Sequence, residues 1–405
     1  MRSQRQTVSD RRFASARYTA LLGPVDLPGG EAGVRERLRM IASQGGHTRV
    51  GLVPDLSSSR WRRDLDRAVA VHTDSRTDLT DHGALMQRGG DESSAALDIS
   101  LTGDHLVITC DHGLGDGVFI TELVAALTHE QTSIFPPFVT DQVRPVRRPS
   151  AHALAATLRR DPTAVMRSAR TIFGRRVATP DAAPASTPTA HAATRTICVS
   201  SPPGFPAGLR ALRDRDFPGA SVTTTLTWLI AGRLRDAGVE LAQTITLMVN
   251  LRRYLPATVV STSNFVGAIT APDASPVAMS RTVRAQIDSA DLVVHQAAAD
   301  ALGALRPRSL RTAHVRRFVA DGPTRLVVSD LSASPAVDTV RWNTLSPAPR
   351  VYAVATVCTR SDELNLVYSR VGDTLFVTAR FFAETHDARV VDAAIRDALT
   401  PAGAR

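Results

Sequence analysis

The sequence contains no lysine, so all 48 of its basic residues are arginines. Aromatic residues are also scarce, at 5% of the 405-residue chain, and the net charge is +9. Nucleic-acid-binding proteins cluster their basic residues on one face or along one helix. Here the arginines are spread along the chain, so we expect no nucleic-acid partner. An excess of arginine is still compatible with other anionic partners.

Cysteine is also rare, since the chain contains only Cys110, Cys198 and Cys358. Their long spacings exclude a disulfide framework and the ligand pattern of a structural zinc site. No apolar run approaches the roughly 18 residues of a membrane-spanning helix, and no secretory signal follows the N-terminus. We therefore expect a cytoplasmic protein. The sequence also lacks a dinucleotide-binding fingerprint, a phosphate-binding glycine loop and clustered metal ligands, so we expect no metal and no redox cofactor.

A hydrophobic content of 43% provides a sizeable core, and 405 residues correspond to two or three domains at about 150 residues each. The segment 178–194 consists almost entirely of Ala, Pro, Thr, Ser and His, which bury too little apolar area to order a chain. We therefore predict an N-terminal lobe over 1–140, a partly flexible crossover over 141–195 and a C-terminal lobe over 196–405.

Hydrophobic periodicity predicts helices and strands that alternate in both lobes. The predicted helices cover 31–43, 58–71, 118–129, 151–173, 221–237, 277–302 and 387–399. The predicted strands cover 95–101, 105–110, 196–199, 244–249, 264–270, 326–329, 351–357, 364–367 and 374–382. This alternation indicates an α/β or α+β architecture.

One segment, 106–119, carries a pattern typical of catalysis. A buried-type strand leads directly into His112, a glycine-rich turn with Gly113 and Gly115 follows, and Asp116 and Gly117 open a helix. This arrangement would present an imidazole on a rigid element. An imidazole with a pKa near 6.5 can accept and return a proton at neutral pH. Histidine is more often a surface or core residue, but the combined setting favours a catalytic role for His112.

The segment from His112 to Gly117 resembles the HxxxDG motif of the chloramphenicol acetyltransferase-like superfamily. We consider the bacterial branch, with polyketide-associated acyltransferases, wax ester synthases and condensation domains. Segments 249–256, 264–267 and 328–331 are similar to motifs of its second lobe, so the resemblance extends over about 15–400. The DFGWG motif of the plant enzymes is absent, and Asp330 stands where Asn is commoner.

The resemblance implies two lobes, each a mixed sheet flanked by helices, with an active-site tunnel between them and His112 at its middle. His112 would be the general base in transfer of an acyl group from a coenzyme A or phosphopantetheine thioester to a hydroxyl or amine. Asp116 would support the His loop by pairing with an arginine, for which Arg252 is the first choice and Arg253 the second.

Further site residues are less constrained by the sequence. Gly117 belongs to the catalytic motif, and Arg252, Asn264 and Ser329 are candidates for substrate binding. Asn264, Ser329 or a main-chain amide near Gly115 could donate hydrogen bonds to an oxyanion. The acyl thioester would be a co-substrate rather than a bound cofactor.

Three functions stay open at this point. The first is an acyltransferase of specialised metabolism or lipid assembly, with a small-molecule acceptor and an acidic acyl carrier protein as a candidate partner. The second is a free-standing condensation-type enzyme that joins carrier-bound substrates. The third is a non-catalytic scaffold of the same fold that recruits a carrier protein. A hydrolase is disfavoured, because neither a Gly-x-Ser-x-Gly nor an HExxH motif is present.

Overall fold

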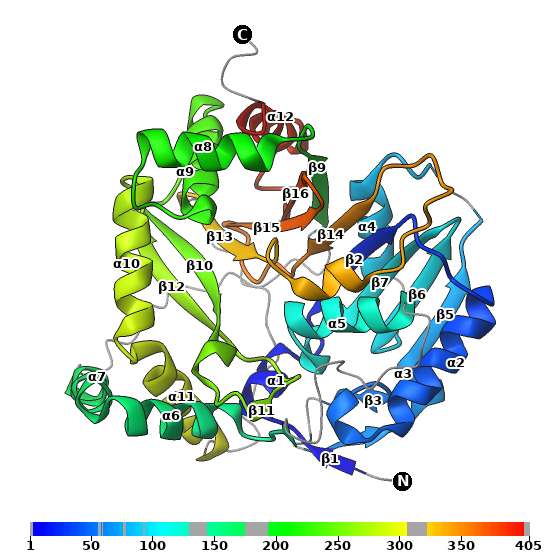
Figure 1. Ribbon diagram of the computed structural model, residues 1–405, viewed down its shortest axis with the longest axis horizontal. Helices are drawn as coiled ribbons and strands as arrows, with labels where there is room; N and C mark the ends of the chain where they lie inside the picture. The colour runs from blue at the N-terminus through cyan, green and yellow to red at the C-terminus, as the bar shows by residue number, and fades with distance from the viewer. Residues whose placement is uncertain are drawn as a thin grey trace.

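Two mixed sheets organise the computed structural model of the chain (Figure 1). The structure describes residues 3–400 except 56–57, 59, 76–77, 92–93, 129–143, 175–192 and 306–321. The boundary predicted near residue 140 and the predicted flexible stretch 178–194 lie outside the described residues, apart from the last two positions of that stretch. Among the described helices, none has the length and apolar character needed to cross a membrane.

The larger sheet has six strands in the order β12-β10-β13-β15-β16-β9. Its strands are β9 (Thr194–Ser200), β10 (Thr244–Asn250), β12 (Val266–Pro272), β13 (Arg325–Asp330), β15 (Glu363–Val371) and β16 (Thr374–Phe382). Parallel pairing joins β13 to both β10 and β15, whereas the outer pairs are antiparallel.

The second sheet has five strands in the order β14-β2-β7-β6-β5. Its strands are β2 (Arg17–Gly23), β5 (Val69–Thr73), β6 (Leu97–Thr102), β7 (His105–Asp111) and β14 (Val351–Ala355). Two small sheets complete the described set. They contain β1 (Ser3–Arg5), β4 (Arg60–Arg63) and β3 (Leu52–Val53), and β11 (Val259–Val260) paired with β8 (Arg144–Pro145).

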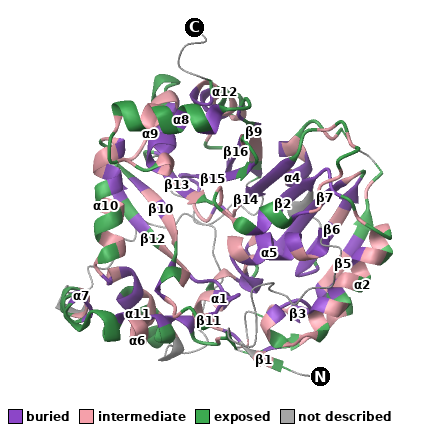
Figure 2. Cartoon of the chain, in the orientation of Figure 1, coloured by how far each residue is buried: buried purple, intermediate pink, exposed green. Residues whose placement is uncertain are grey.

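Helices flank both sheets, and each sheet has its own apolar core, visible as the buried strands of Figure 2. Beside the five-stranded sheet lie α2 (Gly30–Ser43), α4 (His82–Asp91) and α5 (Gly117–Thr128). Beside the six-stranded sheet lie α8 (Phe205–Asp216), α9 (Val222–Asp236), α10 (Pro276–Asp288) and α12 (Ala388–Ala398). A third group, α6 (Pro149–Arg160), α7 (Pro162–Gly174) and α11 (Asp291–Leu305), packs below it.

Strand β14 connects the two sheets. It pairs antiparallel with β2, although 351–355 falls within the range predicted for the C-terminal lobe. The Ser369 hydroxyl of β15 donates to the Tyr352 carbonyl at 2.6 Å, and the Thr378 hydroxyl of β16 donates to the Val354 carbonyl. One strand from the second half of the chain therefore completes the sheet that carries His112.

Most predicted elements are present within a few residues of their expected ends. The predicted hairpin of 95–101 and 105–110 is formed by β6 and β7, and Gly103 takes the positive φ of +59° that its turn requires. Helix α9 begins after Ser221, whose side chain accepts a hydrogen bond from the Thr224 amide, as expected for an N-cap.

The prediction of a helix over 58–71 is wrong. This range contains strand β4, the short helix α3 (Leu65–Ala68) and the beginning of β5. In β4 the side chains alternate between exposed Arg60, buried Trp61 and exposed Arg62, which is the two-residue period of a strand. A single apolar residue between arginines is compatible with both the helical and the strand period, because the segment is too short to distinguish them.

Two long predicted helices are each divided in two. The predicted helix 151–173 breaks at Asp161, because the following Pro162 disfavours helical backbone at the preceding residue. The predicted helix 277–302 breaks between α10 and α11, where Ala290 has a φ of +62°.

We predict that Trp61→Ala lowers the free energy of unfolding by about 3–5 kcal/mol, because a fully buried indole would leave a cavity. The indole also donates a hydrogen bond to the Asp55 carbonyl at 3.1 Å. Chemical denaturation followed by circular dichroism measures the loss. Trp342→Ala, at a half-buried position, is the control and should cost clearly less. Equal losses in both variants would contradict the burial argument.

Candidate active site

His112 lies at the end of β7, in the single 3₁₀ turn η2 (His112–Leu114) that connects the strand to α5. Its ring stacks on Phe13, with 4.6 Å between centroids and 17° between planes, and meets Tyr18 edge-on at 5.0 Å. Phe13 ends helix α1 (Val8–Phe13), and Tyr18 belongs to β2. Two aromatic rings from the N-terminal segment therefore set the orientation of the imidazole.

Burial lowers the pKa of His112 below its usual value of 6.5. The main chain of His112 itself and the negative charge of Asp116 act in the opposite direction on this pKa. The Nδ1 atom is buried and makes no hydrogen bond of good geometry with the described residues. The lowered pKa favours the neutral imidazole, which is the protonation state that a general base requires.

The main-chain carbonyls of the His loop are held by side chains from distant segments. Asn264 Nδ2 donates to the His112 carbonyl at 2.6 Å. Arg49 Nη2 donates to the Gly113 carbonyl at 2.9 Å, and Arg49 Nε donates to the Leu114 carbonyl. Three successive carbonyls are thus fixed by two side chains.

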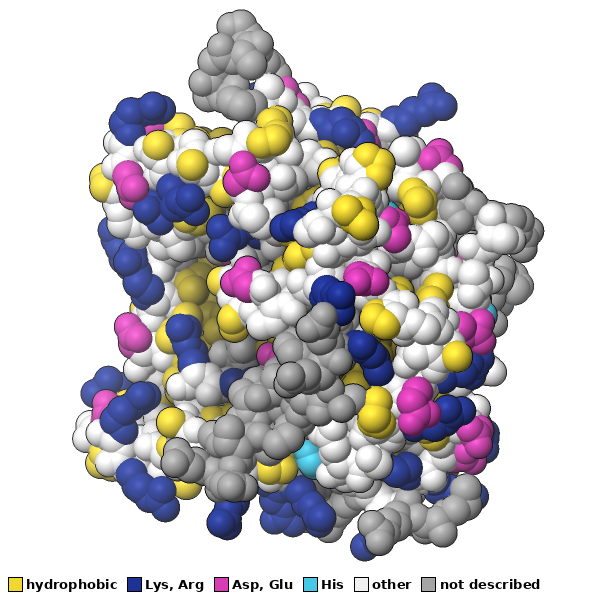
Figure 3. All heavy atoms as spheres, turned by 45° about the vertical axis from the view of Figure 1, so that its right-hand side comes forward, with side chains coloured by type: hydrophobic (Ala, Val, Ile, Leu, Met, Phe, Trp, Pro, Cys, Tyr) yellow, Lys and Arg dark blue, Asp and Glu magenta, His cyan; other side chains and the backbone are white. Residues whose placement is uncertain are grey.

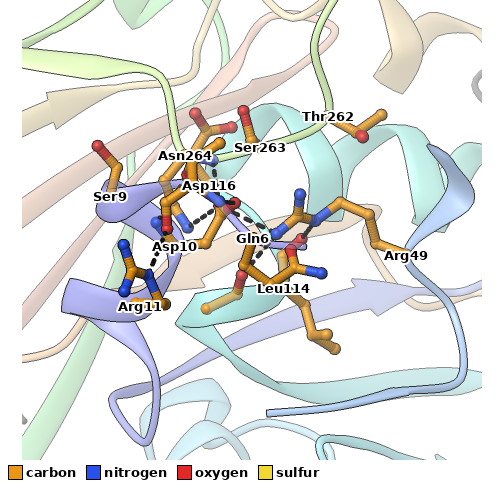
Figure 4. Close-up of polar contacts among 12 residues, drawn as sticks. Gln6, Ser9, Asp10, Arg11, Arg49, Leu114, Asp116, Thr262, Ser263 and Asn264 are labelled. Atoms are coloured by element: carbon orange, nitrogen blue, oxygen red, sulfur yellow. Dashed lines mark hydrogen bonds and ion pairs between the residues drawn. The ribbon is translucent and has the colours of Figure 1, made fainter. Parts of the chain in front are cut away.

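Asp10 holds both of those side chains in place (Figure 4). It is 0% exposed, and its Oδ1 lies 3.0 Å from Arg49 Nη2. The same oxygen accepts from the main-chain amide of Asn264 at 3.0 Å and from Asn264 Nδ2 at 3.2 Å. Asp10 also forms a capping box with Thr7, so the first helix, the His loop and the second half meet at one carboxylate.

Asp116 forms the contact with Arg252 that the resemblance implied. Arg252 Nη1 lies 2.8 Å from Asp116 Oδ2, and Arg252 Nη2 lies 3.1 Å from Oδ1. The carboxylate also accepts from the amides of Phe265 at 3.0 Å and Val118 at 3.1 Å. Its pKa is lowered although desolvation alone would raise it, because Arg252 and these donors favour the charged form.

Arg252 engages all five of its N–H donors within the protein. Besides Asp116, its donors reach the carbonyls of Ser261 and Ser263 at 2.7 Å each and Asn250 Oδ1 at 3.3 Å. Its side chain is 12% exposed. The prediction that Arg252 binds substrate is therefore replaced by a role in holding the loop, because no donor is left for a ligand.

The other predicted binding residues have different surroundings. Both amide hydrogens of Asn264 are taken by Asp10 and the His112 carbonyl, so this side chain has no hydrogen left for an oxyanion. Ser329 lies in β13, and no described contact joins it to the His loop. Arg253 is exposed and does not contact Asp116.

Two glycines of the motif are needed for close packing between the two halves. A Cβ on Gly115 would lie 2.9 Å from the Thr262 carbonyl and 2.4 Å from Cβ of Phe119. A Cβ on Gly117 would lie 2.8 Å from the Leu331 side chain. Gly117 thus contributes room for a second-half residue rather than a chemical group.

The sequence did not predict the roles of Asp10, Arg49, Phe13, Tyr18 or Asp111. The Thr7-x-x-Asp10 spacing indicates a helix start, but nothing local identifies Arg49 as a partner 39 positions away. Asp111 accepts hydrogen bonds from the amides of Gly113 and Ser15 at 2.8 and 2.9 Å. Burial raises the pKa of Asp111 to about 6.

A cavity of about 1280 Å³ lies beside this network. It is lined by residues from the first half, from α6 and the segment before it, and from the second half, including Thr262 and Ser263. Asp10 and Arg49 form part of its wall, but His112 is not among the described lining residues. The expectation that His112 stands at the middle of a tunnel between the lobes is therefore not tested by this cavity; its ring contacts Phe13 and Tyr18, and the residue is partly buried.

Comparison with known proteins places the fold among acetyltransferases and condensation domains. No protein-family model matches the chain, and no curated protein sequence matches it. The structure is similar to the trichothecene 15-O-acetyltransferase TRI3 of Fusarium sporotrichioides, with a TM-score of 0.60, 11% identity and coverage of 98% of this chain and 94% of that one.

Two further structures are similar over nearly the full length. The condensation domain of the monacolin K polyketide synthase MokA gives a TM-score of 0.57 at 12% identity, covering 98% of this chain and 97% of that one. TRI101 of F. graminearum, complexed with coenzyme A and deoxynivalenol, gives 0.54 at 11% identity, covering 95% and 96%. At these identities the comparisons establish the expected two-lobed acyltransferase and condensation-domain fold.

We predict that Arg252→Met lowers the free energy of unfolding by about 3–5 kcal/mol, because it leaves the buried Asp116 carboxylate without its cation. Arg253→Met removes an equal charge from the adjacent exposed position and should change stability little. Chemical denaturation of both variants measures the difference. In the double variant Asp116→Asn/Arg252→Met, part of the loss should be recovered; additive losses would contradict a direct pairing.

Proposed function

We propose that the protein is an acyltransferase that moves an acyl group from a thioester of coenzyme A or of a carrier protein to a hydroxyl or amine. His112 is the general base in this proposal. The observation that carries it is an imidazole at the end of a strand, on a loop that is fixed by both halves of the molecule through Asn264 and the pair of Asp116 and Arg252. Burial, which lowers the pKa of His112, favours the neutral form that a base requires.

The proposed reaction begins with proton transfer from the acceptor hydroxyl or amine to His112. Because Nδ1 is buried in the protein, Nε2 is the nitrogen that takes the proton. The acceptor atom attacks the thioester carbonyl and forms the new C–O or C–N bond. The C–S bond then breaks, and the imidazolium returns the proton to the departing sulfur. These steps balance without a metal or a resident cofactor.

Asp116 acts on this reaction through its position rather than as a second base. Within the described part of the chain, its carboxylate oxygens accept hydrogen bonds from Arg252 and from main-chain amides. Its negative charge favours the imidazolium that forms transiently. A carboxylate whose pKa is held low keeps that charge throughout the reaction.

The similar structures support the same class of chemistry. TRI3 is a trichothecene 15-O-acetyltransferase, and the TRI101 structure is a complex with coenzyme A and deoxynivalenol, as their names state. A condensation-type enzyme with carrier-bound substrates is the second candidate, favoured by the similarity to the MokA domain. Specialised metabolism or lipid assembly is the setting that we propose for either activity.

We predict that His112→Ala lowers the rate of acyl transfer by at least about 100-fold, which is the lower end of the contribution of a general base. The assay offers acyl-coenzyme A and acyl-carrier thioesters with hydroxyl and amine acceptors and detects products by mass spectrometry. A preference between the two donors separates the two candidate functions.

The matched control for this variant is His72→Ala, an exposed histidine beside Asp98 on the far strand of the same sheet, which should leave the rate unchanged. Full activity of His112→Ala would contradict the proposal. So would a folded wild-type protein that transfers no acyl group from either class of thioester.

We predict that kcat/KM falls on the acidic side with a midpoint below pH 6.5, because the base must be neutral and burial lowers the pKa of His112. Asp111 has a pKa of about 6 and would contribute to the same limb by releasing the amides of Ser15 and Gly113. The pH profile is therefore measured in wild type and in Asp111→Asn. A limb that disappears in Asp111→Asn would assign it to Asp111 and not to His112.

A further inference from the structure

The cavity of about 1280 Å³ beside the His loop has a strongly positive lining. Its lining arginines are Arg11, Arg49, Arg60, Arg63, Arg147 and Arg148. The only described acidic residues in the lining are Asp10 and Asp300. Figure 3 shows basic side chains gathered along the lower edge of the molecule, the edge at which Figure 1 places β1 and β11.

Three of these arginines have no partner for their guanidinium groups among the described residues. Arg49 and Arg63 are used internally, since Arg49 binds Asp10 and Arg63 donates to the carbonyls of Ala42 and Gly45. Arg60, Arg147 and Arg148 are exposed, and no side-chain hydrogen bond or ion pair engages their guanidinium groups within the described chain. Each guanidinium can therefore donate to an anion in the cavity.

The N-terminus of α6 adds main-chain donors at the same place. Arg148 is its N-cap residue and provides no side-chain cap, and Pro149 occupies the first helical position. The amides of Ser150 and Ala151 have no intrahelical acceptor, and both residues line the cavity. Free amides at the start of a 12-residue helix favour a negatively charged ligand.

The two aspartates do not cancel this positive charge. Asp10 is paired with Arg49 at 3.0 Å. Asp300 is engaged by hydrogen bonds with Ser9, Gln296 and the side chain of Ser150 at the start of α6, and these two carboxylates stand against six arginines in the lining. The lining therefore contains more positively charged side chains than negatively charged ones.

We propose that this cavity binds a multiply charged anionic group, a phosphate ester or pyrophosphate, through Arg60, Arg147, Arg148 and the first amides of α6. The site is separate from the imidazole of His112, and the proposal rests on the cavity rather than on acyl transfer. The same chemistry could belong to the nucleotide phosphates of a thioester donor or to a phosphorylated acceptor.

The position of the cavity gives such a ligand a direct connection to the His loop. Arg49, Thr262 and Ser263 all line the cavity. Arg49 binds the Gly113 and Leu114 carbonyls, and the Ser263 carbonyl accepts from Arg252. A ligand seated here would therefore lie against the groups that fix the loop.

The test is isothermal titration of the full chain with inorganic pyrophosphate at constant ionic strength. The triple variant Arg60→Gln/Arg147→Gln/Arg148→Gln should weaken binding at least about tenfold, since several charge-assisted hydrogen bonds are lost. The control variant Arg195→Gln/Arg210→Gln/Arg325→Gln removes three exposed arginines that lie outside the cavity lining and should bind as wild type does. Thermal melting confirms that both variants fold.

Equal weakening in the two triple variants would overturn the proposal, because it would indicate attraction to net charge alone. Absence of pyrophosphate binding to wild type would overturn it as well. Competition by coenzyme A would support the proposal and assign the site to a thioester donor. Competition by glycerol 3-phosphate without competition by coenzyme A would support it and assign the site to a phosphorylated acceptor.

Binding by the His112→Ala variant separates this proposal from the proposed function. That variant should bind pyrophosphate as wild type does even though its rate of acyl transfer is at least about 100-fold lower. Normal anion binding without acyl transfer in wild type would refute the function and keep the site, and the reverse result would refute the site alone.

Discussion

The bidentate ion pair between Asp116 and Arg252 is the contact on which the arrangement of the site depends. Its two charges are almost completely removed from water, with Asp116 3% and Arg252 12% exposed. An isolated charge at such a depth is very costly, so each partner requires the other. Because Asp116 opens the helix after the His loop and Arg252 follows β10, the pair fixes the second half against the catalytic segment of the first.

A second buried pair, Asp10 with Arg49, repeats this principle on the opposite side of the loop. The Arg49 guanidinium donates to two carbonyls of the loop. The Asp10 carboxylate accepts a hydrogen bond from Asn264, which also donates to a third loop carbonyl. Each carboxylate is paired with a guanidinium, so the loop is fixed by two ion pairs, and the charge of Asp116 only partly offsets the effect of burial on the imidazole. Desolvation then dominates, and the pKa of His112 falls.

The local parts of this account could be predicted from the sequence. The hairpin of β6 and β7, the glycine turn and α5 follow from short-range periodicity, and the setting of His112 follows from them. The pairing of Asp116 with Arg252 was predictable only through the resemblance to a known motif, since 136 positions separate the residues. Asp10 and Arg49 were missed because nothing near either residue reveals the other.

The errors in the predicted elements have equally local causes. Trp61 between arginines fits a helix or a strand, and only its burial in a three-stranded sheet decides between them. In the segments 151–173 and 277–302, the helical spacing of apolar residues continues without interruption in the sequence. The helical backbone nevertheless breaks, at Asp161 in the first segment and at Ala290 in the second. The addition of β14 to the first sheet depends on contacts across most of the chain, which periodicity does not report.

The central claim, that the fold keeps His112 neutral and ready to accept a proton, is tested most directly by ¹⁵N NMR titration of the histidine side chains. The signal that disappears in His112→Gln identifies this imidazole among the eleven histidines. The account predicts a neutral ring at pH 7 that titrates with a midpoint below 6.5. A ring that is still protonated above about pH 7, beyond the usual value for histidine, would contradict it.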